Sequence, residues 1–146
     1  MATKVNFDAT ITFYFDGGDS ISVEGQEFYS SPHQGSYDTI TNAFYQSLVV
    51  SFEDTWTTGR VDRKSINMGT VAACVCERTS VKEDSGRRVQ LAFEKMSLYF
   101  SVKEQNSAGV QSSFREAVAH NKLFVLTDGV RKTMFADQKK IKYLNG

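Results

Sequence analysis

Cys74 and Cys76 are the residues best suited to chemistry, because thiolates are the soft ligands that zinc and copper prefer. A structural zinc site needs four ligands, and the chain contains two cysteines and two histidines in all. The histidines, His33 and His120, lie far from the cysteines in the sequence. We therefore interpret both cysteines as buried core residues, and we expect no metal ion and no other cofactor.

Neither histidine belongs to a catalytic motif. His33 lies in a loop with Pro32 and Gly35, and His120 lies near the end of a predicted helix. A histidine-activated nucleophile needs a Ser, Thr or Cys beside it, and the sequence has no Gly-x-Ser-x-Gly elbow. The glycine pair at 17–18 lies in a predicted hairpin without a Gly-Lys-Ser/Thr motif, so the sequence contains no phosphate-binding loop.

Two adjacent acid pairs, at residues 53–54 and 83–84, are the remaining candidates for catalysis. Paired carboxylates do acid and base work where burial separates their proton affinities, whereas these pairs lie beside polar residues in predicted turns. We interpret them as solvated surface acids and expect no catalytic residues. The sequence favours a function in binding over one in catalysis.

The charges are balanced overall but are unevenly distributed along the chain. Residues 1–57 carry one lysine against eight acids, and residues 122–146 carry six bases against two acids. The predicted acidic partner face consists of Asp8, Asp16, Asp19, Glu24 and Glu27. The predicted basic surface for nucleic acid or a partner consists of Arg87, Arg88, Arg131, Lys132, Lys139, Lys140 and Lys142. Either strands from both ends share a sheet and the charges meet, or the molecule has an acidic and a basic face.

The element expected to organise the fold is one long β-hairpin from Val71 to Val102, turning at residues 83–86. Its second arm alternates apolar and polar residues, and the phase of the alternation slips at residues 94–95. A one-residue slip without a turn signal is typical of a β-bulge, so we predict a bulged, strongly twisted strand. This pairing places Cys76 across from Phe93.

The clearest strand signal is the alternation from Val5 to Asp16, followed by a turn of glycines and aspartates. A three-residue loop at 17–19, with a glycine in the left-handed conformation, would pair Phe15 with Ile21 and Phe13 with Val23.

Helical periodicity predicts a helix over 37–50, although its β-branched tail at 48–52 also fits a strand. Ser and Glu at capping-box spacing, residues 113 and 116, predict a second helix ending near His120 or Asn121. Strands are predicted over 123–126 and 130–136 around a turn at 128–129. Residues 137–146 are predicted to form an edge strand or a basic tail.

These elements predict a single domain over 1–146 in the order ββα-ββ-α-ββ. The expected class is α+β, a mostly antiparallel sheet with long bulged hairpins and two helices packed on one face. No signal peptide or apolar run of membrane-spanning length is present, so we expect a cytoplasmic protein without a membrane partner.

Three functions remain open. The first is self-association into a homo-oligomer, the acidic N-terminal hairpin of one copy meeting the basic C-terminal segment of the next. Small viral or phage structural and accessory proteins share this size, low cysteine content and lack of motifs, which is an analogy of type. The second is nucleic-acid binding through a basic C-terminal hairpin, with Tyr14, Tyr99 and Tyr143 as stacking partners. The third is a small-ligand carrier or enzyme whose aromatic cup is lined by Phe13, Phe44, Phe93 and Phe100.

Overall fold

The computed structural model describes residues 10–24, 44–46, 49–55, 58–77, 87–102, 107–127 and 132–146 of the chain. Within these ranges the elements, in chain order, are β1 (Thr10–Phe15), β2 (Ser20–Glu24), β3 (Val49–Thr55), β4 (Val61–Asn67), the 3₁₀ turn η2 (Met68–Thr70), β5 (Val71–Glu77), β6 (Arg87–Ala92), β7 (Ser97–Val102), α2 (Ser107–Ala119), β8 (Phe124–Thr127), β9 (Lys132–Ala136), the 3₁₀ turn η4 (Gln138–Lys140) and β10 (Tyr143–Asn145).

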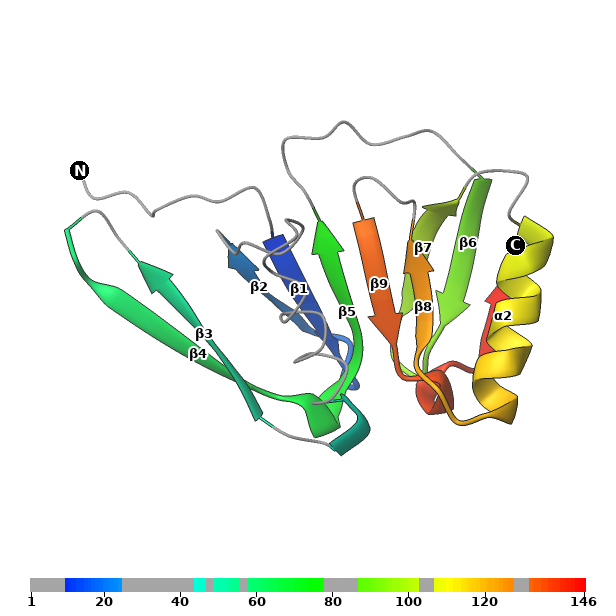
Figure 1. The fold of residues 1–146 in the computed structure, drawn as a ribbon, viewed down its shortest axis with the longest axis horizontal. Coiled ribbons are helices and arrows are strands. Elements are labelled where there is room, and N and C mark those ends of the chain that lie inside the picture. Colours follow the sequence, from blue (N-terminus) through cyan, green and yellow to red (C-terminus); the bar gives the residue numbers. More distant parts are fainter. Residues whose placement is uncertain are drawn as a thin grey trace.

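The central sheet has five antiparallel strands in the order β2-β1-β5-β9-β8, with β5 in the middle (Figure 1). The sequence of β5 is apolar at six consecutive positions from Val71 to Cys76, and five of these six side chains are buried. A continuous apolar run is typical of a strand whose two faces are both covered, since neither face then favours polar residues.

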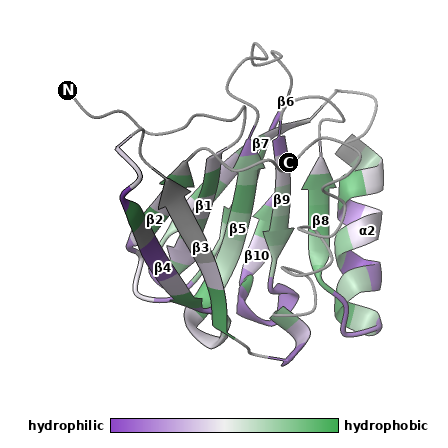
Figure 2. Ribbon diagram, turned by 60° about the vertical axis from the view of Figure 1, so that its left-hand side comes forward, coloured by the Kyte–Doolittle hydropathy of each residue, from purple (hydrophilic) through white to green (hydrophobic). Residues whose placement is uncertain are grey.

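The hairpin of β3 and β4 lies across one face of this sheet, in front of β1, β2 and β5 in Figure 2. Val50 and Ile66 from the hairpin pack there against Ile11, Phe13 and Cys76. Alternation along β1 points its odd-numbered residues into this core.

A second sheet, in the order β10-β6-β7, and helix α2 cover the opposite face (Figure 1). Leu91 and Phe100 from this sheet, Ala117 from α2 and Phe124 and Met134 from the central sheet form the second core. The Phe114 and Phe124 rings meet edge to face with centroids 5.2 Å apart, which joins α2 to β8.

The expected class, an α+β domain with two helices on one face, is wrong, although the mostly antiparallel sheet is confirmed. The molecule is rich in strands, and the ββα-ββ-α-ββ order fits it only roughly. Strand β4 was missed because its sequence is polar from residue 62 to 65, whereas the strand alternative for residues 48–52 anticipated the start of β3. Of the predicted helix over 37–50, residues 44–46 are helical, residues 49–50 already belong to β3, and the rest lies outside the described residues.

The predicted hairpin of Val71–Val102 is also wrong. Strand β5 pairs with β1 and β9, so Cys74 lies between Phe13 and Phe135 and not opposite the later arm. The phase slip at residues 94–95 is a tight turn between β6 and β7, closed by a hydrogen bond from the Phe93 N–H to the Met96 carbonyl at 2.8 Å. Because the chain reverses here, the apolar residues of β6 and of β7 both face the core. A bulge in one continuous strand would have had the same effect on the sequence pattern.

The first hairpin pairs apolar residues with apolar residues, but the predicted register is wrong by two residues. Phe13 pairs with Ile21 and Ile11 with Val23, so the loop is longer than the predicted three residues. Gly18 in this loop has φ +94°, which confirms a left-handed glycine.

Helix α2 begins earlier than predicted, at Ser107, and Ser113 lies inside it. Its end is as predicted: Asn121 has φ 52°, and the Lys122 N–H donates to the Ala117 carbonyl at 2.9 Å in a Schellman arrangement. The strands predicted around residues 128–129 are confirmed as β8 and β9. Residues 137–146 comprise the turn η4 and the short strand β10, which pairs with β6 at the edge of the second sheet. Among the described residues, none of the helices combines the length and the apolar character that crossing a bilayer requires.

Candidate functional site

The acidic and basic sets predicted from the sequence meet inside one chain. The Lys140 ammonium lies 3.1 Å from the Asp16 carboxylate, and it also donates to the Gly69 and Val71 carbonyls at 3.1 Å each. The Asp137 carboxylate is 4.0 Å away. Lys140 therefore holds the C-terminal segment onto the first hairpin and β5. Head-to-tail association between copies stays a prediction.

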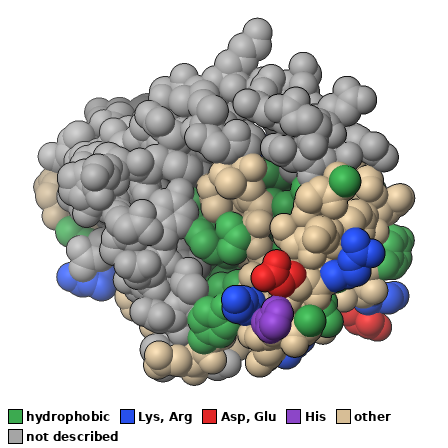
Figure 3. Space-filling model, turned by 45° about the vertical axis from the view of Figure 1, so that its right-hand side comes forward, with side chains coloured by type: hydrophobic (Ala, Val, Ile, Leu, Met, Phe, Trp, Pro, Cys, Tyr) green, Lys and Arg blue, Asp and Glu red, His purple; other side chains and the backbone are tan. Residues whose placement is uncertain are grey.

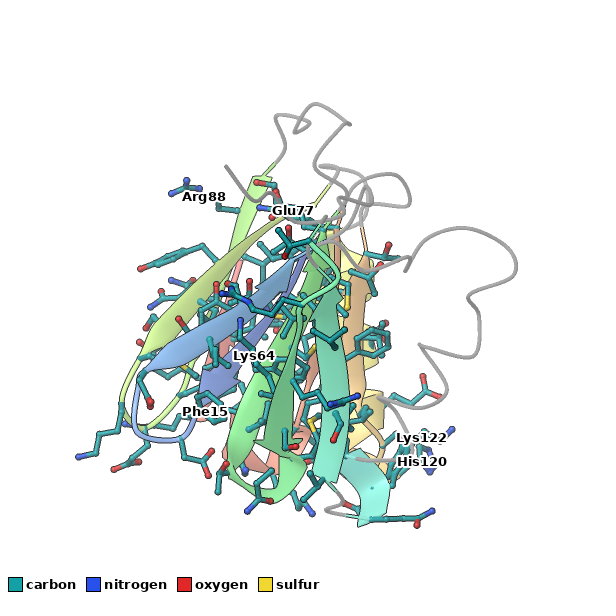
Figure 4. The ribbon with its side chains drawn as sticks, turned by 90° about the vertical axis from the view of Figure 1, so that its left-hand side faces the viewer. Phe15, Lys64, Glu77, Arg88, His120 and Lys122 are labelled. Atoms are coloured by element: carbon teal, nitrogen blue, oxygen red, sulfur yellow. The ribbon has the colours of Figure 1, made fainter. Side chains whose placement is uncertain are left out.

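The other predicted basic residues separate toward two ends of the molecule. Figure 4 shows Arg88 and Glu77 at one end and Phe15 at the other. Lys132 lies at the Glu77 end, 3.9 Å from that carboxylate. Lys139 and Lys142 flank Lys140 in the sequence and lie at the Phe15 end. The described residues of the predicted basic set are therefore divided between two ends of the molecule.

Part of each predicted set lies outside the described residues, namely Asp8, Glu27 and Arg131, as do His33 and the acid pair at 83–84. For Glu24 and Arg87 only the backbone is described, in β2 and β6. Asp19 is exposed in the first turn. Residues 53–54 lie within β3 and not in a turn, which corrects their predicted location.

The most distinctive surface is the outer side of the β10-β6-β7 sheet. Inward residues such as Val89, Leu91 and Phe100 enter the second core, and the residues alternating with them point outward. We call these outward side chains the tyrosine face, which consists of Arg88, Gln90, Ser97, Tyr99, Ser101, Tyr143 and Asn145. None of them is acidic, so the face carries a positive charge from Arg88.

Two aromatic rings stand on this face. Tyr99 is 56% exposed and Tyr143 is 52% exposed. Gln90 of the middle strand lies directly opposite Tyr99 of β7 and Asn145 of β10. Tyr143 is two residues before Asn145 on the same side of β10, so the two tyrosines are diagonal neighbours across β6. The Gln90 amide donates to the Ser97 hydroxyl at 3.1 Å, which fixes its position between the strands.

The Arg88 guanidinium lies over the Tyr99 ring, 5.8 Å from its centroid. A cation at this distance is attracted to the face of the ring. The pair holds a flat ring and a positive charge together on an exposed surface, with amide and hydroxyl groups beside them. Such a surface suits planar rings attached to negative charges.

Sequence reasoning identified Tyr99, Tyr143 and Arg88 separately but could not place them together. The pairing of β10 with β6 brings Tyr143 to the face, and Gln90 was missed. Tyr14, the third expected aromatic, is half-buried in β1 of the central sheet and lies outside the face. The alternation of polar residues along β6 and β7 was the signal available in the sequence.

The four phenylalanines expected to line one cup lie in two separate cores. Phe13 and Phe44 belong to the core under the β3–β4 hairpin, and Phe93 and Phe100 belong to the core on the other side of the central sheet. These four side chains therefore do not line one shared cup.

The groups first considered for chemistry have ordinary surroundings. Both cysteines are free and buried, and burial raises the pKa of the Cys76 thiol well above its usual 9.0, with the neighbouring Cys74 adding to the shift. His120 is exposed beside Lys122, where Figure 3 shows the imidazole on the open surface. Across the described ranges, no three His, Cys, Asp or Glu side chains gather in a way that suits a metal ion.

Comparisons with protein-family models, with curated proteins and with solved structures find no match to this chain. The arrangement of the chain's own residues is therefore the basis for any functional argument.

Proposed function

We propose that the protein binds single-stranded nucleic acid on the tyrosine face. The observation that carries the proposal is the exposed Tyr99 ring with the Arg88 guanidinium 5.8 Å from its centroid. Proteins that bind single strands combine aromatic rings, on which bases stack, with cations that contact the phosphates. Tyr99 supplies the ring and Arg88 the cation, on a face without carboxylates.

The second ring extends the platform. Tyr143 lies diagonally across β6 from Tyr99, so two bases can stack on one side of the sheet. The Gln90 amide and the hydroxyls of Ser97 and Ser101 lie between and beside the rings, where they offer hydrogen bonds to base edges. A double helix hides its base faces in the stack, so this surface favours single strands.

The test is fluorescence anisotropy with a labelled oligothymidine of about 12 nucleotides and with its duplex. We expect Tyr99→Ala and Tyr143→Ala each to weaken single-strand binding by about 1–3 kcal/mol, because each removes one stacking surface. Tyr45→Ala is the matched control, since Tyr45 is 54% exposed and lies away from this face, bonded to the Leu123 N–H.

Arg88→Gln tests the electrostatic part. Removing one phosphate contact lowers the slope of log affinity against log salt by about 0.7 for a single strand. Equal binding by wild type, Tyr99→Ala and Tyr143→Ala would contradict the proposal, as would a preference for the duplex.

A further inference from the structure

A cavity of about 600 Å³ lies at the Phe15 end of the molecule, apart from the tyrosine face. Three turns surround it: the β1–β2 turn, the β6–β7 turn and η4 with the residues after it. The first two turns touch, because a Cβ placed on Gly18 would lie 3.1 Å from the Lys95 carbonyl oxygen. The volume is in the range of small-molecule sites.

The inner wall of this cavity is apolar. Ala72 of β5, Phe93 of the β6–β7 turn and Ile141 contribute to it, and each is at most 8% exposed. These residues also belong to the second core. An apolar group entering the cavity would therefore contact packed side chains and not mobile ones.

The rim of the cavity is rich in lysine. Lys95, Lys139 and Lys142 are exposed at it, and none of their ammonium groups lies within 4.0 Å of a carboxylate of the described residues. Lys140 differs from them, because its three donors are directed to Asp16 and two carbonyls. With Asp16 engaged in this way, Glu94 is the acid left to oppose three lysines.

The backbone explains this division. The Asp137 carboxylate caps η4 by accepting from the Lys139 N–H at 3.1 Å, and the turn ends at Ile141. Within that single turn Lys140 is directed inward to the β5 junction, while Lys139 stays exposed. One lysine is thus used for the fold and its neighbours remain at the rim.

We propose that this cavity binds a small organic anion, whose carboxylate or phosphate lies among Lys95, Lys139 and Lys142 and whose apolar body rests on Phe93 and Ile141. The proposal is independent of nucleic-acid binding, because no residue of the tyrosine face lines the cavity. An inorganic anion would use the rim alone, so both parts of the ligand are needed.

The experiment is isothermal titration with decanoate, adenosine monophosphate, inorganic phosphate and decylamine, using the double variant Tyr99→Ala and Tyr143→Ala so that stacking on either ring of the tyrosine face does not contribute. We expect decanoate or the nucleotide to bind at least about tenfold more tightly than phosphate or decylamine. Decanoate as the tighter ligand identifies a chain-bearing anion, and the nucleotide as the tighter ligand identifies a ring-bearing one.

The double substitution Lys95→Gln and Lys142→Gln should weaken that binding by at least about tenfold, because it removes two of the three rim cations. Both side chains are exposed, so we expect the variant to fold. Lys122→Gln, which changes an exposed lysine beside His120, should bind as tightly as the parent protein. No heat with either amphipathic anion, equal binding by phosphate or decylamine, or no effect of the double substitution would each overturn the proposal.

Discussion

At the scale of single residues, Lys140 shows how a partly exposed lysine stabilises the point where η2 meets β5. The carbonyls of Gly69 and Val71 lie where η2 passes into β5, and the ammonium group of Lys140 supplies hydrogen bonds to both. Its third donor is directed to Asp16 of the first turn. One side chain therefore joins segments from the two ends of the chain and the middle.

We expect Lys140→Met to lower the free energy of unfolding by about 1–3 kcal/mol, because two carbonyls and a carboxylate lose their partner. Lys139→Met makes the same change one residue away at an exposed position and should stay within about 0.5 kcal/mol of wild type. Urea denaturation followed by circular dichroism measures both. Equal stability of the two variants would show that the Lys140 contacts contribute nothing.

Cys76 should make the stability of the protein depend on pH. Burial raises the pKa of its thiol above 9.0 in the folded state, so the neutral thiol is favoured there. The resulting stability is fully present below the unfolded pKa and is lost as the pH rises through the folded pKa, since the unfolded chain releases its proton first. We expect wild type to lose more stability above pH 9.0 than Cys76→Ala, compared by urea midpoints. Parallel pH profiles would contradict this.

At the scale of elements, the close approach of two turns depends on a glycine. Gly18 and Gly59 both have positive φ, +94° and +88°, but a Cβ on Gly59 would meet nothing within 4 Å. Gly59→Ala should cost about 1–2 kcal/mol for the left-handed backbone alone. Gly18→Ala should cost more, because the new methyl group also presses on the Lys95 carbonyl. Thermal unfolding compares them, and equal losses would show that the approach is unstrained.

The strands were predictable where apolar and polar residues alternate regularly. Alternation identified the residues of β1, β6 and β7 as extended, because side chains of a pleated strand point alternately to its two faces. The β6–β7 turn was not predictable, because none of its residues has a positive φ that would demand glycine or asparagine. Among the described non-glycine residues, a positive φ occurs at Asn121, which lies elsewhere. Partners such as β5 with β9 and β6 with β10 depend on contacts distant in sequence. For this reason Tyr99 and Tyr143 could be named but not brought together.

At the scale of the whole molecule, two cores lie on opposite faces of one central sheet. Phe13 and Phe124 are almost fully buried on opposite sides of the central sheet, and β5 contributes side chains to both cores. Loss of either core would expose the same strand. The molecule should therefore unfold as one cooperative unit.

We expect Phe13→Ala and Phe124→Ala each to cost about 3–5 kcal/mol and to shift one shared transition. Near-ultraviolet and far-ultraviolet circular dichroism should give coincident midpoints for both variants. Val125→Ala, at a residue of β8 that is 44% exposed, is the control and should change stability little. Two separated transitions in either phenylalanine variant would show that the cores unfold independently.

The central position of β5 also has a consequence for synthesis. Cys74 pairs with Phe13 on one side and Phe135 on the other, partners that each lie roughly sixty residues away in opposite directions along the chain. Contacts this distant make folding slow, since a long loop must close before the pairing stabilises it. On the ribosome, β1 and β5 can pair only along one edge until β9 has emerged. The nascent chain therefore carries an open strand edge from the synthesis of β5 until that of β9, and the central sheet is completed only then.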